Sequence, residues 1–236
     1  MDEQRRAQAQ RRVRSVEAAA VAGLAYSALT VFSLVQMARY PSLSLPEAEL
    51  TAWFDDPVHS GWLIAGLGSA SVAAIAFLWF VGVIRRRLGE HEDQFFATVF
   101  LGSGVVYVAV SLVGSAAVAS PAVATTVLDA AEVSSSSASL AGGLGAALLL
   151  VVAPRLQAVF IFTTSTVFLR SRVLPSWVAV VGYAVGSLMF VAPIVWRSLG
   201  LAFPIWVSVV SIVLLVRHPS RLRIAETAGD GPVCDL

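Results

Sequence analysis

Two polar residues inside a long apolar stretch, Arg155 and Gln157, are the ones best placed to do chemistry. If the stretch crosses a membrane, an arginine there costs roughly 2.5–3.5 kcal/mol on insertion scales, so it usually binds, gates or pairs with something. Its guanidinium would supply an anion-binding or gating group, with the Gln157 amide beside it and Asp129 or Glu132 as outer partners. The competing interpretation is a structural arginine that reaches the interface or pairs inside the bundle, and the sequence favours it.

The remaining polar residues form no recognisable catalytic site. An intramembrane serine protease needs a histidine near its serine, but the three histidines lie at or beyond the ends of the apolar stretches. Gly102-Ser103-Gly104 is therefore interpreted as a packing feature. Asp55, Asp56 and His59 could together hold a divalent cation, although such groupings are common by chance. We predict no enzyme activity, no catalytic residues, no metal and no cofactor.

The elements that must position these residues follow from composition. Of the 236 residues, 57% are hydrophobic and only 13% are charged, whereas ordinary globular domains have about 25% charged residues. The apolar residues come in blocks, and a helix of about 20 such residues crosses a membrane. We expect an all-α bundle of six spans in one membrane domain (16–216), at about 16–38, 61–84, 95–119, 140–169, 176–196 and 199–216.

Arginines indicate the orientation of these spans. All 16 basic side chains are arginine, and most gather in the tail 1–15, after the second and fourth stretches, and in the tail 217–236. By the positive-inside rule both termini are then cytoplasmic, in a bacterial inner membrane. Arg85, Arg86 and Arg87 would also attract anionic lipid, at about 1 kcal/mol per charge. A formal net charge of +1 argues against nucleic-acid binding, and no Asp or Glu lies in the middle of a span, which argues against ion-coupled transport.

The first loop on the expected outer side is predicted to contain a short helix. Pro46 suits the first turn of a helix, and acidic residues follow it. Leu50, Trp53 and Phe54 would let this helix lie on the membrane surface. Interfacial packing is the favoured role, with a ligand lid as the alternative.

The second outer loop is predicted to contain another helix. Ser120-Pro121 resembles an N-cap followed by a first-turn proline, which would open a helix to about Val133. The serines from 134 to 137 would then form a flexible break.

The stretch from Ser139 to Leu169 is longer than one span needs, since 31 residues of helix extend about 46 Å. Two crossings of about 15 residues each would be too short, and they would place the last arginine cluster outside. We therefore expect one long helix, kinked at Pro154.

Small residues spaced four apart should let the spans approach closely. They occur in three places: Ala19, Gly23 and Ser27; Gly61, Ala65, Ser69 and Ala73; and Gly182 and Gly186. We expect these faces to pack against neighbouring helices.

Three segments of the chain resemble a group of uncharacterised six-helix integral membrane proteins from actinobacteria. They are FLWFVGVIRRRLGE from Phe77, FLGSGV from Phe100, and LPSW from Leu174. The resemblance would cover roughly residues 16–216. It implies the same six-span topology, but the family has no established activity, so no functional residue is carried over.

The sequence thus predicts a membrane protein that is most readily non-enzymatic, with a structural, sensory or partner-binding role. The alternative is a small transporter or ligand-binding membrane protein with a polar site near Arg155 and Gln157. A polar cavity at that site would favour the alternative, whereas a closed, dry bundle would favour the first. Beyond the lipid bilayer, the sequence identifies no protein partner and no oligomeric state.

Overall fold

The computed structural model describes residues 2–42, 44–88, 94–128, 133–171, 175–191 and 200–229. Within these residues every regular element is helical, which agrees with the predicted all-α class. The order is α1 (Asp2–Met37), α2 (Glu47–Asp55), α3 (Pro57–Leu88), α4 (Gln94–Val127), α5 (Ser135–Ala146), a π-helical turn η1 (Ala147–Val152), α6 (Ala153–Ser171), α7 (Ser176–Val191) and α8 (Ala202–Gly229).

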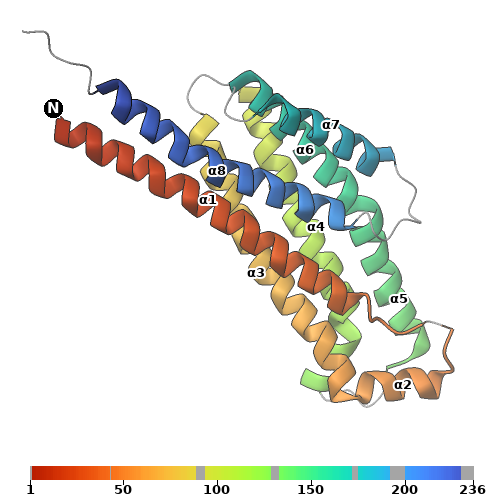
Figure 1. Cartoon of the computed structure of the whole chain (residues 1–236). Coiled ribbons are helices and arrows are strands. Elements are labelled where there is room, and N and C mark those ends of the chain that lie inside the picture. The colour runs from red at the N-terminus through yellow and green to blue at the C-terminus, as the bar shows by residue number, and fades with distance from the viewer. Residues whose placement is uncertain are drawn as a thin grey trace, which may run out of the picture.

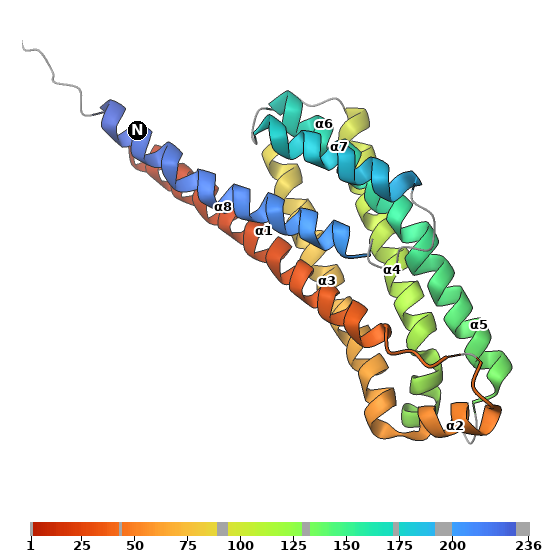
Figure 2. The ribbon, with the colours of Figure 1, turned by 45° about the vertical axis from the view of Figure 1, so that its right-hand side comes forward.

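The long helices form a tilted bundle, and α2 lies across one end of it (Figure 1). Helix α1 packs between α3 and α8, α4 packs between α3 and the α5–α6 rod, and α7 packs mainly on α6. The N-terminus and the end of α8 lie together at the end opposite α2 (Figure 2). Successive long helices therefore run in alternating directions.

Four helical segments are long and apolar enough to cross a membrane, and they confirm the first four predicted spans as apolar helices. These segments are Glu17–Met37, Pro57–Arg85, Thr98–Val127 and Ser135–Arg170. The last two predicted spans correspond to shorter apolar helices, Ser176–Val191 and Ala202–Val216. At 1.5 Å per residue, each of these extends only about 22–24 Å.

The structure corrects the predicted helix start at Ser120-Pro121. Helix α4 continues through Pro121 and ends at Val127, so its predicted end at 119 is wrong. A proline removes the N–H that would bond to the carbonyl four residues earlier. That carbonyl belongs to Ala117, and the Ser120 hydroxyl donates to it at 2.9 Å. The serine thereby replaces the missing amide, and the helix passes through the proline.

The predicted flexible break at residues 134–137 is also wrong. The Ser134 hydroxyl accepts a hydrogen bond from the Ser137 amide at 3.2 Å, which makes Ser134 the N-cap of α5. The serine run therefore starts a helix.

Helix α2 begins at Glu47, as the first loop predicts, but its apolar face does not lie on the membrane surface. Leu50 and Phe54 are 1% and 0% exposed. They pack into a small core with Leu63 of α3 and Ala122 of α4. This helix closes one end of the bundle.

The stretch from 139 to 169 is one continuous helical rod, as predicted. Its irregularity is the π-helical turn η1, which ends just before Pro154; the amide of Ala153 bonds to the carbonyl of Leu148, five residues back. Single π-helical turns inside α-helices are rare and occur often at functional sites.

Close packing at small residues is confirmed on α1 and α7 and wrong at one end of α3. A Cβ added to Gly23 would lie 2.1 Å from Ser211 Oγ, and one added to Gly182 would lie 2.1 Å from Ser165 Oγ. At Gly61 an added Cβ would meet nothing within 4 Å. Further along α3, a Cβ added to Gly66 would lie 3.2 Å from Met37 and 3.3 Å from Gln36 of α1, so the close packing begins there.

The contact at Gly182 gives a stability prediction. Gly182→Ala should lower the free energy of unfolding by about 1–3 kcal/mol, because the new methyl group overlaps Ser165 Oγ. Ser165 Oγ is buried and makes no hydrogen bond within the described part of the chain, so Ser165→Ala alone should cost little. In the Ser165→Ala background, Gly182→Ala should cost less than half as much.

Thermal unfolding of the four proteins in detergent, as a double-mutant cycle, measures this coupling. Gly143→Ala is the control, since a Cβ there meets nothing within 4 Å. Equal costs of Gly182→Ala in both backgrounds would contradict the packing described.

Candidate functional site

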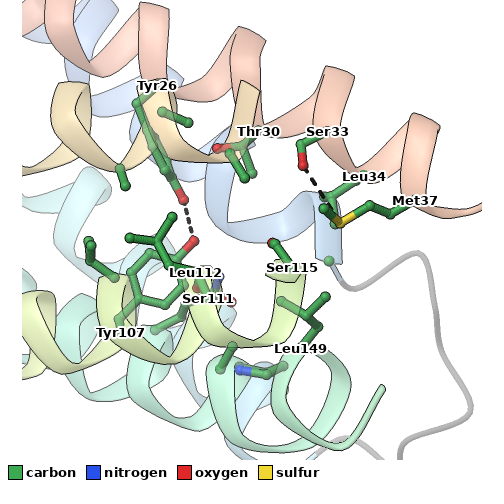
Figure 3. A pocket seen from close by; sticks show the side chains of 18 residues that line it. Tyr26, Thr30, Ser33, Leu34, Met37, Tyr107, Ser111, Leu112, Ser115 and Leu149 are labelled. Atoms are coloured by element: carbon green, nitrogen blue, oxygen red, sulfur yellow. Dashed lines mark hydrogen bonds between the residues drawn. The ribbon is translucent and has the colours of Figure 1, made fainter. Parts of the chain in front are cut away.

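A cavity of about 70 Å³ lies between the helices of the bundle, lined by α1, α3, α4, the η1–α6 rod and Gly200 just before α8 (Figure 3). A space of this size holds a few water molecules or a small polar group. Its polar lining is Tyr26, Thr30, Ser33, Tyr107, Ser111, Ser115 and Gln157, and its apolar lining is Leu34, Met37, Ala70, Ala73, Ala74, Val108, Leu112, Leu149, Ala153 and Pro154.

Two helices present most of the polar groups as matching stripes. Tyr26, Thr30 and Ser33 recur at intervals of four and three along α1, and Tyr107, Ser111 and Ser115 recur at intervals of four along α4. Residues three or four apart share one face of a helix, so each stripe faces the cavity. Figure 3 shows the two sets of side chains converging from opposite sides.

The two tyrosines join at the centre of the site. Their hydroxyl oxygens are 2.7 Å apart, and both side chains are buried. Thr30 lies near the Tyr26 hydroxyl, and Ser111 and Gln157 lie near the Tyr107 hydroxyl. The result is a cluster of hydroxyl groups with an amide beside it.

Ser33 plays a different part. Its hydroxyl donates to the carbonyl of Gly66 at 2.8 Å. This bond ties α1 to α3 at the cavity wall. Because the Ser33 hydroxyl has only one proton and donates it to this carbonyl, it can only accept a hydrogen bond from a ligand.

The lining of the cavity is uncharged. It contains hydroxyls, one amide and apolar groups, and none of its residues is Asp, Glu, Arg or His. Bringing an isolated charge into such a space is far more costly than bringing a neutral group that can form hydrogen bonds. The site is therefore suited to a neutral ligand with hydrogen-bonding atoms.

The structure separates the two residues that the sequence pairs. Gln157 is 7% exposed and lines the cavity, whereas Arg155 lies on the exposed surface of the bundle. The Arg155 guanidinium donates to the carbonyl of Val151 on its own helix. Two residues along a helix turn it by about 200°, so the two side chains point in nearly opposite directions. The proposed outer partners, Asp129 and Glu132, lie outside the described residues.

Sequence reasoning missed the tyrosines and serines of the cavity. The signal was present, because polar residues at helical spacing inside apolar spans mark one polar face. What a single sequence lacks is the information that these faces of α1 and α4 meet.

The grouping of Asp55, Asp56 and His59, which sequence reasoning treats as a chance cation-binding pattern, has a different arrangement. Across the part of the chain that the structure describes, no group of three His, Cys, Asp or Glu side chains could hold a metal ion. The His59 ring stacks on Trp53 at 4.8 Å, and its Nδ1 lies 3.4 Å from Asp56 Oδ2. On the other side His59 contacts Trp62. These residues form an aromatic cluster that joins α2 to α3.

Among the three arginines predicted to attract anionic lipid, Arg85 is exposed. The side chains of Arg86 and Arg87 lie outside the described residues. Exposure leaves Arg85 accessible, and a lipid contact there stays a prediction.

Comparison of the chain with protein-family models, with curated proteins and with solved structures gives no match. The resemblance to actinobacterial six-helix proteins therefore stays a prediction, and function has to be inferred from the geometry of the cavity.

Proposed function

We propose that this protein is a six-span, non-enzymatic protein of the bacterial inner membrane that binds a small uncharged ligand in the cavity between Tyr26, Tyr107 and Gln157. One observation carries the proposal: a polar, uncharged cavity inside an otherwise apolar bundle. Polar groups in a membrane interior are costly and usually functional. The alternative derived from the sequence is thus favoured, with its site moved away from Arg155.

Binding is favoured over transport by what closes the cavity at one end. Phe77 of α3 contacts the rings of Tyr26, Tyr107 and Phe160 at centroid distances of 4.8, 5.4 and 5.1 Å. Phe77 and Phe160 are 0% exposed. A transporter must open such a seal in each cycle, whereas a protein that senses or stores a ligand need not. A sensory role therefore fits this arrangement best.

The six-span topology with cytoplasmic termini is part of the proposal. Arg170 lies in the last turn of α6, and Arg85 lies near the end of α3. Both helices end at the same end of the bundle as the N-terminus (Figure 1). Helix α7 and the apolar part of α8, Ala202–Val216, are short for a membrane of about 30 Å. Flanking arginines that reach the interface would let them cross it.

Ligand binding is tested by thermal unfolding of the detergent-purified protein in the presence of small uncharged compounds without a long hydrocarbon chain, namely glycerol, erythritol and propionamide. A probe at ten times its Kd stabilises by about 1.4 kcal/mol, which raises the unfolding midpoint of a chain of this size by about 3–6 °C. At least one probe should do so in the wild type. The same probe should give less than half the shift in Tyr107→Phe and in Gln157→Leu.

Arg155→Gln is the matched control for this experiment, because Arg155 does not line the cavity. It should keep the full shift. If the probes stabilise wild type and Tyr107→Phe equally, or if Arg155→Gln removes the shift, the cavity is not the binding site.

The topology is tested by labelling single cysteines in intact cells with a membrane-impermeant maleimide. In a Cys234→Ser background, Ser42→Cys and Ser198→Cys should react from outside, and Ser176→Cys should react only after the cells are permeabilised. In the otherwise wild-type chain, Cys234 should also require permeabilisation. Protection of Ser198→Cys in intact cells would mean that α7 and α8 do not cross, leaving four spans.

A further inference from the structure

A second, larger pocket adjoins the polar cavity. It has a volume of about 350 Å³ and shares three lining residues with the cavity, Leu34 and Met37 of α1 and Leu149 of η1. The rest of its lining is Val35, Ala38, Tyr40, Val118, Gly142, Ala146, Leu150 and Leu201. Apart from Tyr40, every one of these residues is apolar. Taken together, the two spaces have a lining that is largely polar at one end and apolar at the other.

Tyr40 forms the wall of this pocket nearest to α2. Its hydroxyl donates to the carbonyl of Ala138 at 2.7 Å and so joins the end of α1 to α5. Its ring packs against Gly142, where an added Cβ would lie 2.9 Å from the ring. Burial raises the pKa of Tyr40 to about 12, so the hydroxyl stays protonated and this bond persists at any physiological pH.

The pocket opens onto an apolar surface. Val35 and Leu201, which line it, are 50% and 37% exposed, and Ala146 is exposed as well. An opening surrounded by exposed aliphatic side chains faces the hydrocarbon of a membrane more readily than water.

We infer that the ligand is an uncharged single-chain lipid whose hydroxyl-bearing head occupies the polar cavity and whose chain occupies the apolar pocket. This inference rests on the proposed function and names its ligand class. The lipid would enter between α1 and α5 from the outer leaflet, since the pocket lies towards the end of α1 opposite the N-terminus. Hydrogen bonds from Tyr107 and Gln157 would select the head.

The lining explains why an uncharged head and a single hydrocarbon chain would be selected. None of the residues in either space is basic, so an anionic head placed in the cavity would find no counter-charge. The residues shared by the two spaces come from α1 and η1 alone, so the boundary between the spaces is narrow, which suits one chain. Met37 lies at this junction, and its flexible side chain adapts to chains of different shape.

The test uses thermal unfolding of the full-length protein in detergent with three probes. These are 1-monoolein, which has the chain and an uncharged head, oleoyl lysophosphatidylglycerol, which has the chain and an anionic head, and glycerol, which has no chain. Monoolein should raise the midpoint at a concentration at least tenfold lower than glycerol. Tyr107→Phe should weaken monoolein binding about fivefold, the loss expected for one hydrogen bond.

A matched pair of variants tests the apolar pocket separately. Ala146→Trp fills the pocket and should abolish the monoolein shift while leaving the smaller glycerol shift in place. Ala147→Trp places the same side chain on the neighbouring exposed residue, which does not line the pocket. It should leave both shifts unchanged.

The outcomes separate this inference from the proposed function. If glycerol stabilises the protein through Tyr107 but monoolein does not, or if Ala146→Trp leaves the monoolein shift intact, the lipid inference fails and the small-ligand proposal stands. If lysophosphatidylglycerol binds more tightly than monoolein and Tyr107→Phe has no effect on it, the pocket holds an anionic lipid in the opposite orientation, and the inference is overturned. If no probe stabilises the protein, both fail.

Discussion

The constraint on which this structure depends is that polar groups inside a membrane must find partners within the chain. The protein meets it largely with hydroxyl side chains that bond to backbone carbonyls of other elements. The donors and acceptors are Ser27 to Pro204, Ser33 to Gly66, Tyr40 to Ala138 and Thr125 to Phe54. Three of these bonds start from α1 and its C-terminal extension, so α1 is held against α8, α3 and α5 at once. Of these bonds, the one from Ser33 joins α1 to α3 at the wall of the cavity.

Against that background the polar cavity is an exception that needs a cause. Its tyrosines, serines, threonine and glutamine are gathered on facing helices as one polar network, in which the two tyrosine hydroxyls bond to each other. Such a network is stable when every group has a partner and costly when some do not. A ligand with hydroxyl or carbonyl groups can form hydrogen bonds with the donors and acceptors that the network itself does not pair. A bundle built only for packing would have filled this space with aliphatic side chains.

Sequence reasoning reached the helical class, the first four spans and the single rod that contains Pro154, because apolar blocks and helix lengths are local properties. It failed where one residue compensates for another. Pro121 alone predicts the end of a helix, but the Ser120 hydroxyl replaces its missing donor. The serine run at 134 alone predicts a break, but one of its serines caps the next helix. Of the two predicted site residues, only Gln157 lines the cavity, and the reason is similar. The sequence gives the depth of Arg155 and Gln157 along a helix, but which of them faces inward depends on how that helix packs.

The position of the cavity follows from one face of α3. Along that face the residues are Gly66, Ala70, Ala73, Ala74, Phe77 and Phe80. Where the side chains are methyl groups, α3 leaves room between α1 and α4, and the hydroxyl stripes face an open space. One turn further on, Phe77 fills the centre of the bundle and contacts the same two tyrosines from the other side. A small residue at position 77 would extend the cavity towards the end of the bundle where the N-terminus lies, and a large one at position 73 would close it. The change from alanine to phenylalanine within a single turn thus determines both where the cavity lies and where it ends.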